Sequence, residues 1–463
     1  MIHLIWGSFP MIALQSRSTD SLPDLGRRIF GLLFVLLILS YAAIGRDVFF
    51  NRLQASNVDD PISANLVYIR CLVAACCLGA AFYLNGLGRL IGLFPVGLLP
   101  FAIFALISSA WSDDLKTSAR EALQFTAFIW AVSCCVSALG KETLFGLLSL
   151  LCACFLVLSA LVAILLPSIG VHTGTEVIQF SHAGRWKGIF VHKNTLGFWA
   201  SVCSTWFLFL LINKRGSSVI NGFVLACSTL CLIFSGSSTA IGTTFFMLIA
   251  YAVLSLRQRV SADLFGAILM VLMAASYVVF TYSLDGILGL FGRDAGLSGR
   301  VDLWFIAQDT IFDAPLLGQG FNAFGGSVFN GLASQYLGKM AAGVESSYLT
   351  LALDTGLVGT VLFLVPVCLW VYDGLRRDLP CEAGGLESRA FLLLALGTLV
   401  LAYTEATAFS VTSSVGCLCL TSFIFLRWQV QSEPNQYLAP GKPRSLGATD
   451  FGRRRTGSAA QPT

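Results

Sequence analysis

The sequence is poor in charged residues. Only 12% of its 463 residues are Asp, Glu, Lys or Arg, whereas 56% are hydrophobic. Average soluble domains carry roughly a quarter of charged residues, so this composition excludes a water-soluble fold. A helix that spans a bilayer needs about 20 mostly apolar residues, and such runs recur along nearly the whole chain. The scarcity of charge therefore predicts an integral membrane protein whose polar chemistry is confined to loops.

Several other features are also lacking. No basic cluster is interleaved with aromatic residues, and the net charge of +4 is small, so nucleic acid is not expected as a partner. The 14 cysteines lie mostly inside apolar runs and show no His/Cys ligand spacing, so we expect no disulfide framework, metal or other cofactor. The N-terminal segment lacks the order of basic, apolar and small residues that marks a cleaved signal peptide.

Apolar windows bounded by charge predict an all-α polytopic membrane protein of about twelve transmembrane helices. The expected spans are 29–45, 66–84, 90–109, 122–139, 143–167, 195–212, 219–234, 240–256, 264–282, 347–371, 390–406 and 410–427. The chain then divides into an N-terminal segment (1–28), nine spans (29–282) that include an external loop (168–194), a large loop (283–346), three spans (347–427) and a disordered tail (428–463).

The distribution of Lys and Arg predicts the orientation. Basic residues gather near both termini and in alternate loops, whereas the large loop 283–346 holds few. The positive-inside rule then places both termini in the cytoplasm and the loops 168–194 and 283–346 on the outer face.

The first of these outer loops concentrates basic residues against that trend. They are His182, Arg185, Lys187, His192 and Lys193. One interpretation is an anion site, in which the Arg185 guanidinium offers a planar fork to phosphate oxygens and the lysines add point charges. The other interpretation is contact with lipid headgroups.

The large loop contains a predicted amphipathic helix at the membrane surface, capped by Ser298. Its residues at helical spacing are Val301, Trp304, Phe305, Gln308, Ile311 and Phe312. Arg300 falls in the first turn, where the helix dipole disfavours a cation unless both face an anion such as phosphate. The alternative is an ordinary surface arginine. After this helix, Pro315 to Gly320 predicts a structural corner.

Glu345, just before the tenth span, is the best general-base candidate, because a carboxylate at the mouth of a membrane helix is costly unless it is solvated, paired or used. As an acidic residue at a helix N-terminus it also needs no function. Asp354 and Glu405 are intramembrane acids that rank behind it. The acidic pairs Asp59-Asp60 and Asp113-Asp114 fit either a divalent metal or plain solvation.

The order of these motifs resembles the O-antigen ligase and polymerase superfamily, and within it the ExoQ-like exopolysaccharide polymerases. The shared motifs are Trp111-Ser112-Asp113, Gly184 to Asn194, Ser235-Gly236-Ser237-Ser238, Gly299-Arg300 with Trp304, Pro315 to Gly320, Glu345 to Leu349 and Gly356 to Gly359. They cover most of residues 100–360. Ligases of that superfamily commonly carry His-Asn where this chain has Glu345-Ser346, which favours a polymerase.

The resemblance implies a glycan donor on undecaprenyl diphosphate and a glycan acceptor, joined without a metal on the periplasmic face of the bacterial inner membrane. It implies that Arg185 and Arg300 hold the diphosphate and that Glu345 is the base. The remaining substrate-binding candidates are Lys187, His192, Lys193, Asn194, Trp304 and Tyr348. Chain-length regulator and export proteins are further partners that it suggests.

Three other functions remain open. An O-antigen or glycan ligase differs from a polymerase in its product. A flippase or permease for lipid-linked glycans predicts polar residues at mid-depth in several spans, and this chain has few. A purely structural partner of an export complex predicts that the loop arginines are replaceable.

Overall fold

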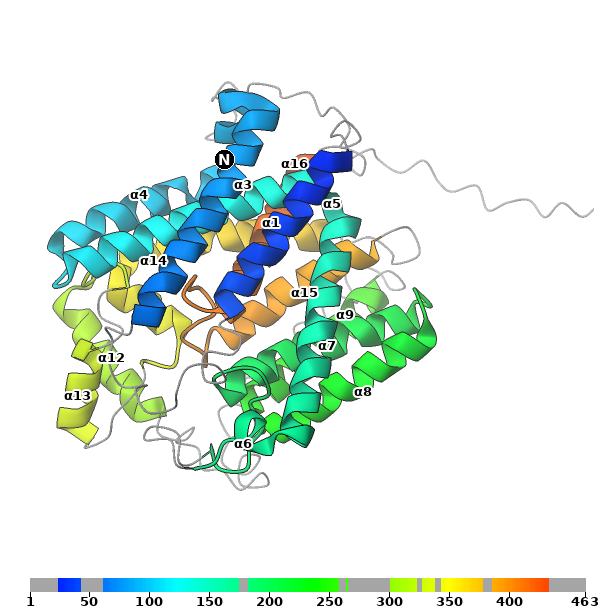
Figure 1. Ribbon diagram of the computed structural model, residues 1–463. Helices are drawn as coiled ribbons and strands as arrows, with labels where there is room; N and C mark the ends of the chain where they lie inside the picture. Colours follow the sequence, from blue (N-terminus) through cyan, green and yellow to red (C-terminus); the bar gives the residue numbers. More distant parts are fainter. Residues whose placement is uncertain are drawn as a thin grey trace, which may run out of the picture.

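Figure 1 shows the computed structural model of the chain. It describes residues 24–42, 61–174, 182–257, 264, 300–322, 327–337, 343–377 and 385–432. Within these ranges the regular structure is helical, with one isolated bridge between Val171 and Trp186. The expected all-α polytopic membrane fold is confirmed.

Ten helices of ten or more residues make up the main bundle in the described ranges. They are α1 (Asp24–Ala42), α3 (Pro61–Leu93), α4 (Leu99–Ser108), α5 (Leu115–Leu165), α7 (Lys193–Ile212), α8 (Ser218–Ser235), α9 (Ser238–Arg257), α14 (Ser347–Arg376), α15 (Leu386–Leu401) and α16 (Ser414–Ser432). The remaining elements are η3 (Val96–Leu98), η4 (Ser109–Trp111), α6 (Pro167–Gly170), α12 (Arg300–Asp313) and α13 (Ser327–Leu337).

Seven of the described helices are long and apolar enough to cross a membrane, and residues 96–111 add a shorter apolar stretch. Two of the seven contain breaks at positions that the sequence predicts as loops between spans. The backbone leaves the helical region at Gly86 in α3 and at Gly140 in α5, and α5 changes direction there (Figure 1). The predicted span 264–282 lies outside the described residues apart from Leu264, and the count of twelve stays a prediction.

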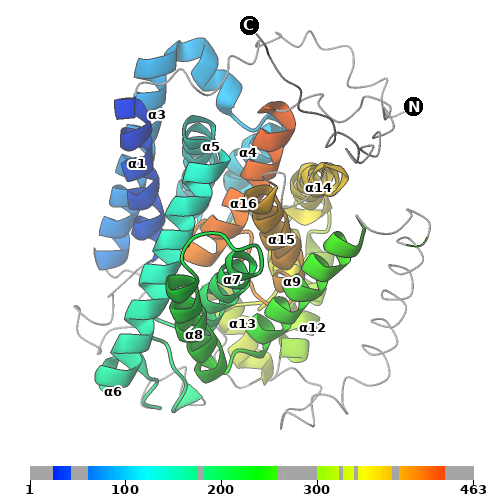
Figure 2. The same ribbon diagram turned by 90° about the vertical axis from the view of Figure 1, so that its right-hand side faces the viewer.

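The helices pack around α5. Helices α1, α3, α7 and α8 all contact α5, and α7, α8 and α9 lie side by side (Figures 1 and 2). Large aromatic side chains fill the interior, among them Trp199, Trp206 and Phe391. Many apolar side chains on the outside stay exposed, as expected where the solvent is lipid.

Helices α12 and α13 lie beside the main bundle, at the lower left of Figure 1. The predicted amphipathic helix exists, but its apolar face differs from the prediction. Leu303, Trp304 and Ala307 turn inward against Phe329 of α13. Phe305 and Phe312 are 63% and 78% exposed, so they do not belong to that face. The reason is the helical period, which places residue 305 outside an arc defined by 303, 307 and 311.

The turn from Pro315 to Gly320 packs into a third break, at Gly356 of α14. Four backbone hydrogen bonds join the two segments: Gln319 N to Leu353 O (3.0 Å), Gly320 N to Asp354 O (2.9 Å), Leu357 N to Pro315 O (2.9 Å) and Val358 N to Leu316 O (3.1 Å). The turn therefore bonds backbone groups that the break removes from the helical ladder, which a membrane interior requires. The Trp111 indole N–H donates to Gly318 O at 3.2 Å and fastens the turn to η4. The predicted corner, residues 315–320, thus fills the break in α14, and we call it the plug.

The predicted span 390–406 ends early. Helix α15 ends at Leu401, and a non-helical segment of residues 402–413 connects it to α16. We call this segment the α15–α16 loop.

Candidate functional site

A cavity of about 230 Å³ lies where residues from four parts of the chain meet. Its walls are His192, Asn194, Thr195, Phe198, Ser237, Thr239, Ala240, Gly343, Glu345, Leu401, Glu405, Ala406, Thr407 and Val415. These come from the start of α7, the start of α9, the segment before α14, and the α15–α16 loop with its flanking helices. The cavity thus gathers residues that are up to about 220 positions apart.

Three helix N-termini point toward this cavity. Helices α7, α9 and α14 begin at Lys193, Ser238 and Ser347, directly beside lining residues. The His192 ring caps α7, because its Nδ1 accepts a hydrogen bond from Asn194 N at 3.1 Å. The first backbone N–H groups of a helix carry partial positive charge, so several of them around one cavity favour an anion.

Two carboxylates line the same cavity. Glu345 adopts a left-handed backbone conformation (φ 55°), which a glutamate rarely adopts and which is typical of functional sites. Glu405 accepts a hydrogen bond from the Asn194 amide at 3.0 Å between Nδ2 and Oε1. The amide therefore fixes one carboxylate oxygen of Glu405. Glu345 lines the cavity from a different segment, the one that precedes α14.

The α15–α16 loop is fixed against the start of α14. Ser347 donates its amide to Ala402 O at 2.8 Å and its hydroxyl to Glu405 O. The same hydroxyl accepts from Ala408 N at 3.0 Å. A hydrogen bond between Thr404 and Thr239 (3.4 Å) joins the loop to α9. These hydrogen bonds fix the backbone on both sides of Glu405, which favours a defined position for its carboxylate.

Arg185 lies against Gly236, the residue before the cavity-lining Ser237. Its loop is fixed to the end of α8, because Trp186 N donates to Phe234 O at 3.0 Å and the two rings stack with centroids 4.6 Å apart. The Arg185 side chain lies on the backbone of Gly236, where an added Cβ would come within 2.7 Å of Nη1. Gly236 has φ 58° and directly precedes Ser237, which lines the cavity. Close approach of the guanidinium therefore depends on a glycine at this position.

Three histidines gather beside the cavity. The ring centroids of His172, His182 and His192 lie 5.2 to 6.0 Å from one another, and His192 is the member that lines the cavity. Among the described residues, no group of three or more His, Cys, Asp or Glu side chains is placed to hold a metal ion. His192 is therefore the member of the cluster that can contact a ligand in the cavity.

The other predicted site residues lie outside the lining. Lys187 and Lys193 are buried in the protein. The Trp304 ring meets Tyr403 of the α15–α16 loop edge to face at 5.2 Å, which connects α12 to the cavity wall. Tyr348 donates its hydroxyl to Leu399 O at 2.8 Å and so has a structural contact. Arg300 is the first residue of α12, and its side chain lies outside what the structure describes.

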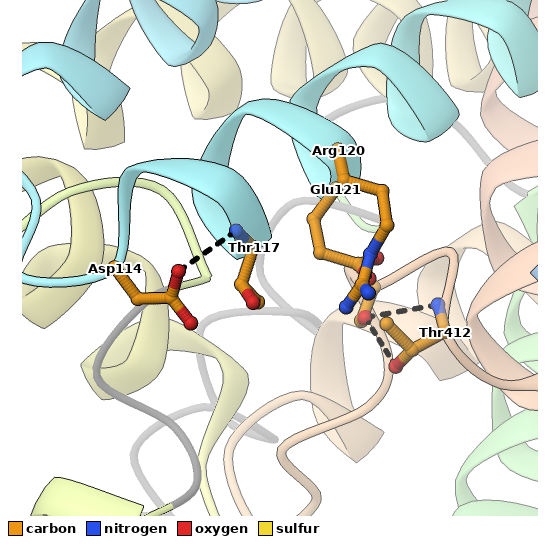
Figure 3. A network of polar contacts seen from close by, with 6 residues as sticks. Asp114, Thr117, Arg120, Glu121 and Thr412 are labelled. Atoms are coloured by element: carbon orange, nitrogen blue, oxygen red, sulfur yellow. Dashed lines mark hydrogen bonds and ion pairs between the residues drawn. The ribbon is translucent and has the colours of Figure 1, made fainter. Parts of the chain in front are cut away.

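Asp114 has a structural role. It caps α5, since its carboxylate accepts from Thr117 N at 3.0 Å (Figure 3). The hydrogen bond from the Thr117 side chain, together with this backbone bond, lowers the pKa of the Asp114 carboxyl. Helix capping therefore accounts for this half of the acidic pair.

Sequence reasoning assigned no role to Ser237 and Thr239, although it noted the motif that holds Ser237. It also did not single out Glu121, because the fourth span was placed at 122–139. Helix α5 begins at Leu115, and Glu121 is buried in its second turn. An acidic residue just outside a predicted span can therefore still be buried in the membrane helix.

The fold and cavity define a multi-pass, all-α membrane protein with a cavity that holds two carboxylates. Residues 223–364 match the O-antigen ligase family. The chain is also 25% identical, over 323 residues, to the exopolysaccharide production protein ExoQ of Rhizobium meliloti (strain 1021); the match covers 65% of this chain and 70% of that protein. These two matches confirm the resemblance to the O-antigen ligase and ExoQ-like proteins. They support a membrane enzyme that processes polysaccharide.

Proposed function

We propose that the protein polymerises oligosaccharide repeat units carried on undecaprenyl diphosphate, to form an exopolysaccharide or other surface polysaccharide. The reaction would take place on the periplasmic face of the bacterial inner membrane, with both termini of the chain in the cytoplasm. The cavity between α7, α9 and α14 is the proposed active site.

The observation that carries this proposal is the meeting of three helix N-termini with two carboxylates in one cavity. A glycan on a lipid diphosphate has an anionic leaving group next to an anomeric carbon. The helix N-termini suit the diphosphate, and a carboxylate suits the proton of an incoming hydroxyl.

The proposed reaction balances without a cofactor. An acceptor hydroxyl attacks the anomeric carbon of the donor, and Glu345 takes the hydroxyl proton. The new glycosidic bond forms as the bond between the anomeric carbon and the diphosphate oxygen breaks. The lipid diphosphate leaves with the electron pair, and its growing charge is stabilised by the helix N-termini, by Arg185 and by Arg300.

Glu405 has a separate proposed role. It is held by Asn194 and stands on the loop that touches α14, so it positions the acceptor hydroxyl relative to Glu345. Two carboxylates beside a diphosphate repel it unless positive charge is near, and the buried Lys193 at the start of α7 contributes such charge.

A deletion strain complemented with variants tests the proposal. Glu345→Gln keeps the shape of the side chain but removes the base, so cells should accumulate single lipid-linked repeat units and lose polymer. Asp309→Asn, on the exposed side of α12, is the matched control and should restore polymer. Full-length polymer in the Glu345→Gln strain, at a normal protein level, would contradict the proposal.

A glycan ligase is the second candidate, favoured by the match of residues 223–364 to the O-antigen ligase family. The same deletion strain distinguishes the two, because loss of a ligase leaves long lipid-linked chains rather than single units. A flippase or permease is a third candidate from another class. Chain-length regulator and export proteins are the partners expected for a polymerase.

A further inference from the structure

Helices α12 and α13 form a small hydrophobic cluster with the start of α14. Ala307 of α12 and Phe329 of α13 are fully buried, and they pack with Val344 and Leu353, which are 3% and 2% exposed. Among the described residues this cluster is separate from the main core of the bundle. Helices α12 and α13, which we call the α12–α13 unit, therefore dock on α14 from outside the bundle interior.

The α12–α13 unit holds the residue before Glu345. Val344 lies in the cluster, whereas Ser347 donates its amide to Ala402 O and its hydroxyl to Glu405 O in the α15–α16 loop. The left-handed backbone of Glu345, with φ 55°, persists only where the surrounding structure holds it. Glu345 is thus anchored on both sides, and the α12–α13 unit provides one of the two anchors.

The same unit contacts the segment that carries Glu405. Trp304 of α12 packs against the cluster, and its ring meets the Tyr403 ring edge to face with centroids 5.2 Å apart. Tyr403 lies two residues before Glu405 in the α15–α16 loop. Trp304 is not among the described residues that line the cavity, so its contact with the cavity wall is the Tyr403 ring.

One helical unit therefore touches both segments that present a carboxylate to the cavity. Catalytic groups must be held within about 0.5 Å of their productive geometry, and contacts outside the cavity usually hold them there. A displacement of the α12–α13 unit would shift the two carboxylates relative to each other and to the bound substrates.

We propose that α12 positions the two carboxylates of the cavity, Glu345 through the cluster around Val344 and Glu405 through the contact between Trp304 and Tyr403. Trp304 is then a positioning residue, whereas the family resemblance implies that it binds substrate. This inference rests on the proposed function, because the position of the carboxylates affects a rate only if the protein transfers glycans. The contacts themselves do not depend on that function.

Variants of the full-length protein, purified in detergent, test the role of Trp304. Trp304→Ala removes the ring contact, and Trp304→Phe keeps an aromatic ring but removes the indole N–H. Phe305→Ala is the matched control, because this neighbouring aromatic side chain is 63% exposed and lies outside the cluster. A chain-extension assay on lipid-linked repeat units gives kcat and KM, and melting curves give the stability of each variant.

We expect Trp304→Ala to lower kcat about 10- to 100-fold with less than about a 3-fold change in KM, because misplaced carboxylates affect the transition state more than binding. Trp304→Phe should keep kcat within about 3-fold of wild type, since a ring can still meet Tyr403. Phe305→Ala should match wild type. A wild-type kcat in Trp304→Ala, whatever its melting temperature, overturns the proposal. A raised KM in both Trp304 variants also overturns it, because direct substrate binding predicts that result.

A second background shows whether Trp304 acts through Glu405. In protein that already carries Glu405→Gln, Trp304→Ala should lower kcat by less than about 3-fold, because the residue that it positions has lost its charge. If the two losses multiply instead, Trp304 acts by another route and the proposed role is wrong.

Val344→Ala tests the anchor of Glu345. It removes two carbon atoms from the cluster and should lower kcat about 10-fold. Val361→Ala is the matched control, because this valine of α14 is 47% exposed and should keep the wild-type kcat. Equal values of kcat in the two variants would contradict a positioning role for Val344.

Hydrogen exchange distinguishes a failure of this inference from a failure of the proposed function. Ala408 N donates to Ser347 Oγ at 3.0 Å and Ser347 N donates to Ala402 O at 2.8 Å, so exchange of these two amides reports the fixed loop without any activity. If Trp304→Ala speeds their exchange about 10-fold but wild-type protein extends no glycan, the positioning contact stands and the transferase function is wrong. If wild-type protein extends glycans and Trp304→Ala changes neither exchange nor kcat, the function stands and this inference is wrong.

Discussion

Gly356→Ala is expected to destabilise the protein strongly, because two backbone segments meet at this glycine. Gly356 has φ 60° and ψ −167°, a region that only glycine adopts freely. A Cβ at this position would lie 2.3 Å from the carbonyl carbon of Leu316 and 2.4 Å from its oxygen. The opposing atoms are backbone, so they cannot move away as a flexible side chain would.

The size of the effect follows from the contacts at risk. The substitution separates the Pro315–Gly320 turn from α14 and endangers the four backbone hydrogen bonds between them. At about 1 kcal/mol each they contribute roughly 4 kcal/mol. If the turn instead stays in place, the cost is backbone strain at residue 356, about 1 to 3 kcal/mol. The two cases bracket an expected loss of about 1 to 4 kcal/mol, the upper end of which is large for a single substitution.

Thermal unfolding in detergent measures this effect, with Gly146→Ala as the matched control. Gly146 lies in the second half of α5, and an added Cβ there meets nothing within 4 Å. Because alanine favours a helix over glycine by about 1 kcal/mol, the control should be neutral or slightly stabilising. If Gly356→Ala melts within about 1 °C of wild type, a difference worth less than 1 kcal/mol, the proposed plug in α14 is wrong.

Three further predictions concern Arg185, Glu405 and the start of α5. Gly236→Ala should displace Arg185 and lower the transfer rate about 10- to 100-fold in the extension assay; an unchanged rate would argue against a role for Arg185. Asn194→Ala should lower the rate about 10-fold by releasing Glu405, and Asn194→Asp should lower it further because it places a second negative charge there. Asp114→Ala should cost about 1 kcal/mol of stability at pH 7 through loss of the cap. The folded-state pKa of Asp114 is lowered, so the cap stabilises the protein above the carboxyl's usual pKa of about 3.9 and this contribution is lost as the pH falls. The melting curves of wild type and variant should therefore converge in acid.

The sequence predicted the membrane fold because hydropathy and the lengths of apolar runs decide it almost alone. The breaks at Gly86 and Gly140 fall between predicted spans for the same reason, since charge and glycine cluster there. The early end of α15 was not predictable, because residues 402–406 contain no proline or glycine. Ser347 fixes this non-helical segment by tertiary hydrogen bonds that no local pattern reveals.

Cavity residues were predictable from the sequence only where a charged residue lay in an unexpected place, at the mouth of a membrane span or in a loop expected to hold few cations. Glu345 was conspicuous at the mouth of a span, and His192 and Asn194 belong to a loop with too many cations for its side. All three line the cavity. Ser237 and Thr239 carry no charge and join the cavity only because α9 packs beside α7. Glu121 was missed because the fourth predicted span begins at residue 122, whereas α5 begins at Leu115.

The central claim is that the protein transfers lipid-linked glycans in this cavity, with Glu345 as the base. The most direct measurement is extension of lipid-linked repeat units by the purified protein in detergent, without nucleotide sugars. We expect the wild-type protein to lengthen the glycan and Glu345→Gln to do so at least about 100-fold more slowly. Equal rates for the two proteins, with both folded and both binding the donor, would contradict the claim.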